Sequence, residues 1–174
     1  MVLLLACEGL LVRIRVNETA ETTIPARSVV EGLLDDFGFA GFTGLDITAS
    51  QELANQGVRP GDIVDTRVVR FDLRVLNPED GDLSFLDALS VFVEAPGMDR
   101  VRIAHLDDFP EGEAEVAMDL DDVDITDHVV SESMTVTTEA SGRRPDRATT
   151  VEADFGLSVG VTGQGACNAV QGGG

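Results

Sequence analysis

The segment from residue 151 to 161 carries the longest strict alternation of side-chain character in the chain. Its apolar positions are Val151, Ala153, Phe155, Leu157, Val159 and Val161, and the positions between them are Glu152, Asp154, Gly156, Ser158 and Gly160. Successive side chains of a β-strand point to opposite faces of a sheet, so a period of two residues is typical of a strand with one buried face. The alternation predicts a long central strand with its second face in water.

Shorter segments repeat this pattern and are separated by turn sequences such as NPEDGD and APGMD. The predicted strands are residues 11–16, 69–75, 89–93, 101–103, 116–120 and 134–138. We expect the strand at 134–138 to form a hairpin with the long strand through the segment SGRRPD. Val123 and Ile125 stand at the opposite parity to Val116 and Met118, which predicts a β-bulge near residues 121–122.

Two segments in the N-terminal third have helical signals. Ala26–Gly38 has Ser28 as a helix cap, Glu31 three residues later, and a glycine at its end. A second short helix is predicted from Ser50 to Asn55. The Gly-rich stretch between these helices, GFAGFTGLD, is predicted to be a loop.

The order of these elements predicts the fold class. Six or seven strands without strand–helix–strand alternation indicate a mainly β protein, an antiparallel β-sandwich of immunoglobulin-like type with one or two short helices in the N-terminal third. At 174 residues the chain has the length of one domain.

The charge of the chain limits its partners. The formal net charge is −20, and all twelve basic residues are arginine. Such a surface repels nucleic acids and anionic lipid headgroups, because binding to phosphates requires clustered positive charge. We therefore expect no nucleic-acid partner. A hydrophobic fraction of 43% excludes a disordered acidic tail.

The first seven residues end in Leu4-Leu5-Ala6-Cys7, after an apolar run. This stretch resembles the lipobox of bacterial lipoproteins, in which a small residue precedes the modified cysteine. The resemblance implies export, attachment of diacylglycerol to Cys7, and cleavage before it. The acidic, lysine-free β-domain is also similar to uncharacterised envelope lipoproteins of high-GC Gram-negative bacteria, which implies an outer-membrane or periplasmic location.

The domain organisation follows from this resemblance. Residues 1–6 are expected to be a truncated signal-peptide remnant, residues 7–166 a single β-sandwich domain, and residues 167–174 a flexible tail. Two other states of Cys7 stay open. It could form a disulfide with Cys167, which excludes lipidation because the thioether consumes the sulfur, or it could be an unpaired thiol in a cytosolic protein.

Two charged clusters are candidate sites. Oxygen ligands for Ca²⁺ could come from an acidic cluster made of Asp119, Asp121, Asp122 and Asp124. The spacing of these residues differs from that of an EF-hand. The alternative is that the cluster is a solvated strand edge. No other cofactor is expected. Arg143 and Arg144 are the one local concentration of positive charge, suited to an acidic partner or a phosphate-bearing glycan.

No catalytic motif stands out in the sequence. We therefore expect a non-enzymatic, exported, lipid-anchored structural or binding module of the cell envelope, whose partner is an envelope protein or glycan. Recognition would reside in end loops such as those around Asp80, Asp108 and Arg143. The alternatives are a hydrolase using paired carboxylates from distant loops and a soluble Ca²⁺-dependent binding module.

Overall fold

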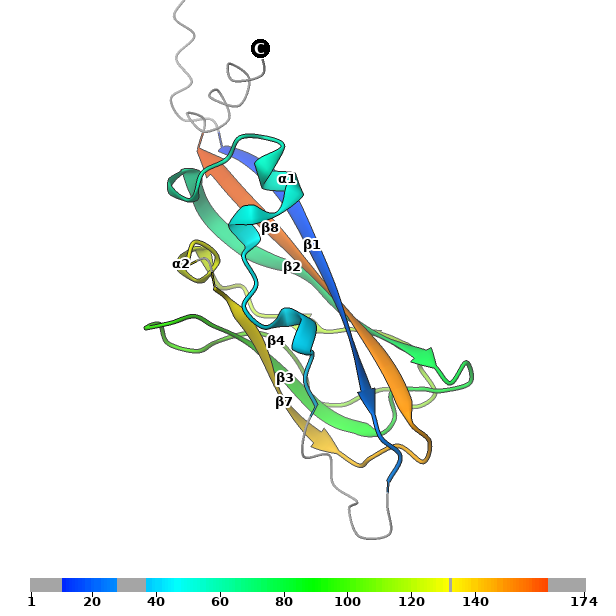
Figure 1. The fold of residues 1–174 in the computed structure, drawn as a ribbon. Helices are drawn as coiled ribbons and strands as arrows, with labels where there is room; N and C mark the ends of the chain where they lie inside the picture. Colours follow the sequence, from blue (N-terminus) through cyan, green and yellow to red (C-terminus); the bar gives the residue numbers. More distant parts are fainter. Residues whose placement is uncertain (1–10, 28–36, 132, 163–174) are drawn as a thin grey trace, which may run out of the picture.

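The computed structural model describes residues 11–27, 37–131 and 133–162, which form two four-stranded antiparallel sheets (Figure 1). The strands are β1 (Leu11–Ile24), β2 (Ile63–Asn77), β3 (Leu86–Glu94), β4 (Val101–Leu106), β5 (Glu115–Ala117), β6 (Asp119–Leu120), β7 (Thr135–Gly142) and β8 (Thr149–Thr162). The first sheet has the order β1-β8-β2-β5 and the second β6-β4-β3-β7. The predicted mainly β, antiparallel sandwich with short N-terminal helices is confirmed.

Strand β8 lies at the centre of the first sheet, as predicted. It pairs with β1 without interruption from Leu11 opposite Thr162 to Ile24 opposite Thr149, and with β2 on its other side. Its apolar side chains, from Val151 to Val161, are buried in the core between the sheets. The long alternation therefore marks the strand that is hydrogen-bonded on both edges.

The second face of β8 is less exposed than predicted. Glu152 and Asp154 are half-buried, and the residues that follow on the same face, Gly156, Ser158 and Gly160, are buried. Arginine side chains from β2 lie over part of this face: Arg70 reaches Asp154 at 2.7 Å and Arg74 reaches Glu152 at 2.5 Å. A methyl group on Gly156 would lie 3.1 Å from the Cβ atom of Arg70, so a side chain there fits only if its neighbour shifts by a few tenths of an ångström.

The chain passes between the two sheets at most of its connections. The β3–β4 pair is a hairpin within the second sheet, whereas the β2–β3, β4–β5, β5–β6 and β7–β8 connections each change sheet. Strands β1 and β8, the first and last strands of the described chain, are neighbours in the first sheet.

The predicted hairpin between the strands at 134–138 and 151–161 is wrong. Strand β7 pairs with β3 in the second sheet, and β8 lies in the first. The six residues 143–148 join the two sheets, a length sufficient for sheets that pack about 10 Å apart. Alternation identifies a half-buried strand but contains no information about its neighbour.

The predicted β-bulge near residues 121–122 is also wrong. The chain leaves β5 in the first sheet, crosses to β6 in the second, and leaves that sheet after Leu120. Ile125 is then buried from a segment outside any strand, next to α2 (Thr126–Val129). The change of parity thus reflects a change of sheet.

The N-terminal segment contributes more to the core than a loop prediction implies. Phe42, in the 3-10 helix η1 (Ala40–Phe42), is fully buried with ring centroids 6.4 Å from Phe71 and 5.9 Å from Phe155. Phe39 continues this cluster at 5.8 Å from Phe42. The GFAGFTGLD stretch therefore packs aromatic rings against the first sheet.

The remaining short helices between β1 and β2 lie in segments with turn-forming residues. They are η2 (Ile47–Ala49), α1 (Gln51–Ala54) and η3 (Pro60–Asp62), and α1 confirms the short helix predicted at Ser50–Asn55. No helix among the described residues is long and apolar enough to cross a membrane. The central residues of the predicted helix at Ala26–Gly38 lie outside the described residues; Arg27 and Phe37, near its two ends, are not helical.

Strand β1 extends eight residues beyond its predicted end, to Ile24. Glu18 occupies a core-facing position of this strand, between buried Val16 and Ala20, so the apolar pattern is interrupted although the strand continues. Burial raises the pKa of Glu18, and the nearby carboxylate of Glu52 in α1 raises it further. The ionised form of Glu18 therefore disfavours the folded state.

We expect Glu18→Gln to stabilise the protein at neutral pH. Because the folded-state pKa is raised, the cost of ionisation is present above that pKa and disappears at lower pH, where the carboxyl is protonated in both states. The rise in Tm should be on the order of 1 °C at pH 7, since solvent screens a partly exposed group, and should vanish below about pH 4. Thermal unfolding at several pH values measures it. Glu21→Gln, an exposed site on the same strand, is the control; an equal gain from both variants would contradict the local explanation.

Candidate functional site

Three strand ends of the first sheet meet at one end of the sandwich. Ile24, the last residue of β1, lies opposite Thr149, the first residue of β8, and Asn77 at the end of β2 lies opposite Thr150. Residues next to these strand ends, together with Ser84 and Phe85 just before β3, line a hollow. The strand ends lie toward the lower right of Figure 1. This hollow is called the loop-end pocket below.

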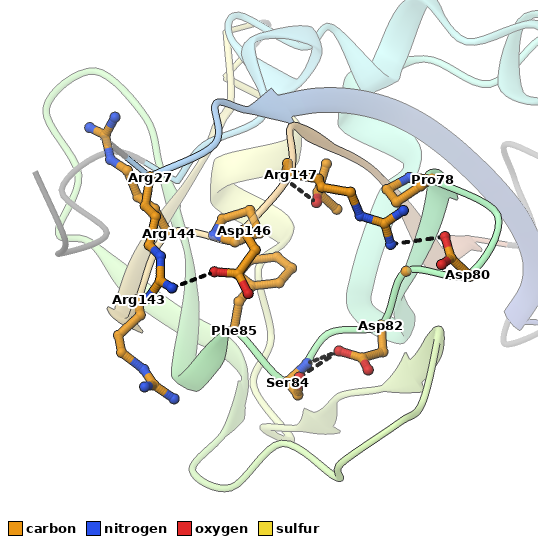
Figure 2. A pocket seen from close by; sticks show the side chains of 13 residues that line it. Arg27, Pro78, Asp80, Asp82, Ser84, Phe85, Arg143, Arg144, Asp146 and Arg147 are labelled. Carbon is orange, nitrogen blue, oxygen red and sulfur yellow. Dashed lines mark hydrogen bonds and ion pairs between the residues drawn. The ribbon is translucent and has the colours of Figure 1, made fainter. Parts of the chain in front are cut away.

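The loop-end pocket has a volume of about 360 Å³. Its lining residues are Arg27, Pro78, Asp80, Gly81, Asp82, Ser84, Phe85, Arg143, Arg144, Pro145, Asp146, Arg147 and Thr149. Figure 2 shows Arg147 and Asp80 on one side of the opening and Arg27, Arg143 and Arg144 on the other, with Ser84 and Asp82 between them along the rim. Buried Phe85 and Pro145 form its apolar part.

Backbone hydrogen bonds hold the walls of the pocket together. The amide of Arg143 donates to the carbonyl of Phe85 at 2.8 Å, and the amide of Arg27 donates to the carbonyl of Pro145 at 3.0 Å. Gly142, the last residue of β7, makes the first contact possible. It has φ of +149°, and a Cβ atom there would lie 2.3 Å from the carbonyl oxygen of Phe85.

The pocket concentrates positive charge in an acidic chain. Four of the twelve arginines line it, with three aspartates. Arg27 pairs with Asp146 at 2.9 Å and Arg147 pairs with Asp80 at 2.9 Å. The hydrogen bond from Arg147 lowers the pKa of Asp80. All four paired side chains are more than half exposed, so these ion pairs are weak and exchangeable.

A second hollow of about 710 Å³ adjoins the first and is acidic. Its lining residues are Asp82, Ser84, Leu86, Asp87, Asp108, Phe109, Glu111, Gly112 and Arg143. The two hollows share Asp82, Ser84 and Arg143. Arg143 therefore lies between a surface rich in arginine and one rich in carboxylates.

The structure brings together the three loops expected to carry recognition. Asp80 and Arg143 line the first hollow, and Asp108 and Arg143 line the second. Arg144, the second predicted basic residue, also lines the first. Arg27 was missed in the sequence because it stands alone, more than a hundred residues before Arg143, and only strand pairing brings them to the same end.

The predicted Ca²⁺ ligands do not converge. Asp121 pairs with Arg102 at 2.6 Å, Asp122 pairs with Arg67, and Asp124 accepts hydrogen bonds from the backbone and hydroxyl of Thr126. Asp119 is exposed in β6. In the described part of the chain, no group of three His, Cys, Asp or Glu residues could hold a metal ion.

The surroundings of His128 are structural. His128 is buried in α2, and its Nε2 atom lies 2.9 Å from the backbone carbonyl of Asp99. The hydroxyl of Ser131 donates to the backbone carbonyl of His128 at 2.6 Å, so it points away from the imidazole nitrogens. Cys7 and Cys167 lie outside the described residues.

Comparisons with known proteins were made for the whole chain. No family model and no curated protein match it. Among solved structures, it is similar to the BFDV capsid protein in a 60-mer crystal structure, with a TM-score of 0.47, 10% identity, and coverage of 87% of this chain and 93% of that chain. The decameric crystal structure of the BFDV capsid protein gives 0.45, 10%, 87% and 99%. Similarity at this level assigns no function to the chain.

We predict that Gly142→Ala destabilises the protein strongly. The new methyl group would overlap the carbonyl of Phe85 at a φ that L-residues rarely adopt, so β7 and the segment at Phe85 must separate. The free energy of unfolding should fall by more than about 2 kcal/mol, measured by denaturant titration. Gly61→Ala, where a methyl group meets nothing within 4 Å, is the matched control. Equal effects of the two substitutions would refute the close approach at Gly142.

Proposed function

We propose that the chain is a non-enzymatic, exported β-sandwich, anchored through Cys7 to a bacterial envelope membrane, that binds a partner at the loop-end pocket. The observation that carries the proposal is the placement of the two ends of β1. This strand starts at Leu11, four residues after Cys7, and ends at Ile24 beside the pocket. Its 14 residues extend roughly 45 Å at about 3.3 Å per residue.

An anchor before Leu11 would attach the end of the sandwich that is remote from the pocket. The pocket would then face away from the membrane and be accessible to envelope components. The net charge of −20 supports this arrangement, because anionic headgroups repel an acidic domain and keep it away from the membrane surface.

The form of the pocket favours binding over hydrolysis. It is open and rimmed by loops, and the pKa of Asp80 within it is lowered by Arg147, the opposite of what a general acid requires. Carboxyls with a raised pKa in the described residues, Glu18 and Asp72, lie on strands outside both hollows. A carboxylate-pair mechanism therefore has less support than a binding module.

The pairing of Leu11 with Thr162 also bears on the alternative for Cys7. Cys7 precedes this pair by four residues and Cys167 follows it by five, so a disulfide between them is compatible with the sheet register. Lipidation adds acyl mass to the mature chain, whereas the disulfide lowers the mass of the chain slightly, so the two states can be distinguished by mass.

We expect the protein recovered from its native envelope fraction to begin at Cys7 and to carry added acyl mass. Intact mass spectrometry measures this. Cys7→Ser should move the protein from the membrane fraction to the soluble fraction, whereas Cys167→Ser, the matched control, should leave it membrane-bound. An unmodified chain that retains Met1, or a mass lower by two hydrogen atoms from a Cys7–Cys167 disulfide, would exclude the anchor.

A further inference from the structure

We propose that the loop-end pocket binds an anionic sugar, a saccharide that carries a phosphate or carboxylate group. The inference rests on the proposed function in one respect, since it names the ligand class of the same pocket. It is independent of the anchor, because the residues that line the pocket belong to the described sandwich.

The first argument is the local charge. A chain with 32 acidic and 12 basic residues places four arginines beside three aspartates in the lining of one hollow, a higher proportion of basic groups than in the chain as a whole. Guanidinium groups bind phosphate and carboxylate through two parallel hydrogen bonds, a geometry that suits a planar or tetrahedral anion. Positive charge at this end attracts an anion that the rest of the surface repels.

The second argument is that the side chains of Arg143 and Arg147 are accessible to a ligand. Among the described residues, no carboxylate lies within 4 Å of the guanidinium of Arg143, which is exposed on the rim. Arg147 is 59% exposed in its pair with Asp80. A ligand anion can therefore bind Arg143 directly and share or replace the partner of Arg147 without disrupting buried structure.

The third argument concerns the carboxylates beside the arginines. Asp80, Asp82 and Asp146 would repel a ligand that is only an anion, but they accept hydrogen bonds from hydroxyl groups. Ser84 donates from its amide and its hydroxyl to Oδ1 of Asp82, at 3.0 and 2.5 Å. Within the described chain no hydrogen bond reaches Oδ2 of Asp82, so this oxygen is available to a ligand hydroxyl. A ligand with both hydroxyls and negative charge matches the mixed lining.

The size and the apolar part of the pocket agree with this class. A volume of about 360 Å³ is in the range of small-molecule sites and accommodates a monosaccharide with its anionic group. Pro78 is partly exposed in the lining and offers apolar surface to the C–H face of a sugar ring, with buried Phe85 and Pro145 behind it. The ligand is therefore expected to have its anion at the arginine side and its hydroxyls toward Asp82 and Ser84.

The test uses the full chain with Cys7→Ser, which needs no membrane. Isothermal titration at low ionic strength compares glucose 6-phosphate, glucuronate, glucose and inorganic phosphate. We expect glucose 6-phosphate or glucuronate to bind at least tenfold more tightly than both glucose and phosphate. Preference between the first two identifies phosphate or carboxylate as the anionic group.

Substitutions in the pocket test whether the ligand binds there. Arg143→Gln and Arg147→Gln should each weaken the anionic sugar at least tenfold, and Asp82→Asn should weaken it while changing inorganic phosphate little. Arg15→Gln, at an exposed position on β1 outside both hollows, removes the same charge and should change the affinity less than twofold. Melting temperatures of all four variants confirm that each is folded.

Three outcomes would overturn the inference: no binding by any probe, inorganic phosphate as tight as the sugar phosphate, or equal losses from Arg15→Gln and the pocket variants. None of these bears on the anchor, which the mass of the mature chain tests separately. Conversely, an unlipidated Cys7 would leave a sugar-binding result intact.

Discussion

The double pairing of β8 is the constraint on which the rest of the structure depends. This strand is hydrogen-bonded to β1 over its whole length and to β2 on its other edge. Its apolar face packs into the core between the sheets, where Phe155 contacts both Phe71 and Phe42. Because β1 and β8 are the first and last strands, their pairing brings distant parts of the chain together at each end of the sandwich.

Strand pairing also explains how the candidate site forms. Arg27 follows β1, Asp80 and Asp82 follow β2, and the three remaining arginines lie between β7 and β8. None of these segments is a site by itself. They become neighbours because the ends of β1, β2 and β8 coincide, and because Gly142 allows β7 to end against the backbone of Phe85.

Arginine has two roles in this acidic protein. On the outer face of the first sheet, Arg70 and Arg74 pair with carboxylates of β8 and cover its second face, where alternation alone predicted water. At the loop end, Arg27 and Arg147 lie beside an open hollow and form exposed ion pairs with Asp146 and Asp80. The first group contributes to the sheet, whereas the exposed side chains of Arg143 and Arg147 are the ones that the proposed ligand would contact. The sequence showed Arg143 and Arg144 as a local concentration but could not distinguish these roles, which depend on what each side chain faces.

The sequence by itself determined where most of the strands lie, the sandwich class and the short helix α1, because hydrophobic period and turn chemistry are local properties. Only the tertiary structure decided which strands are neighbours: β7 pairs with β3 instead of β8, and the segment after Met118 changes sheet instead of bulging. Alternation specifies a buried face but not a partner, since every half-buried strand presents the same pattern. The pocket depends on those partners, so its composition, including Arg27, follows from the register of the first sheet.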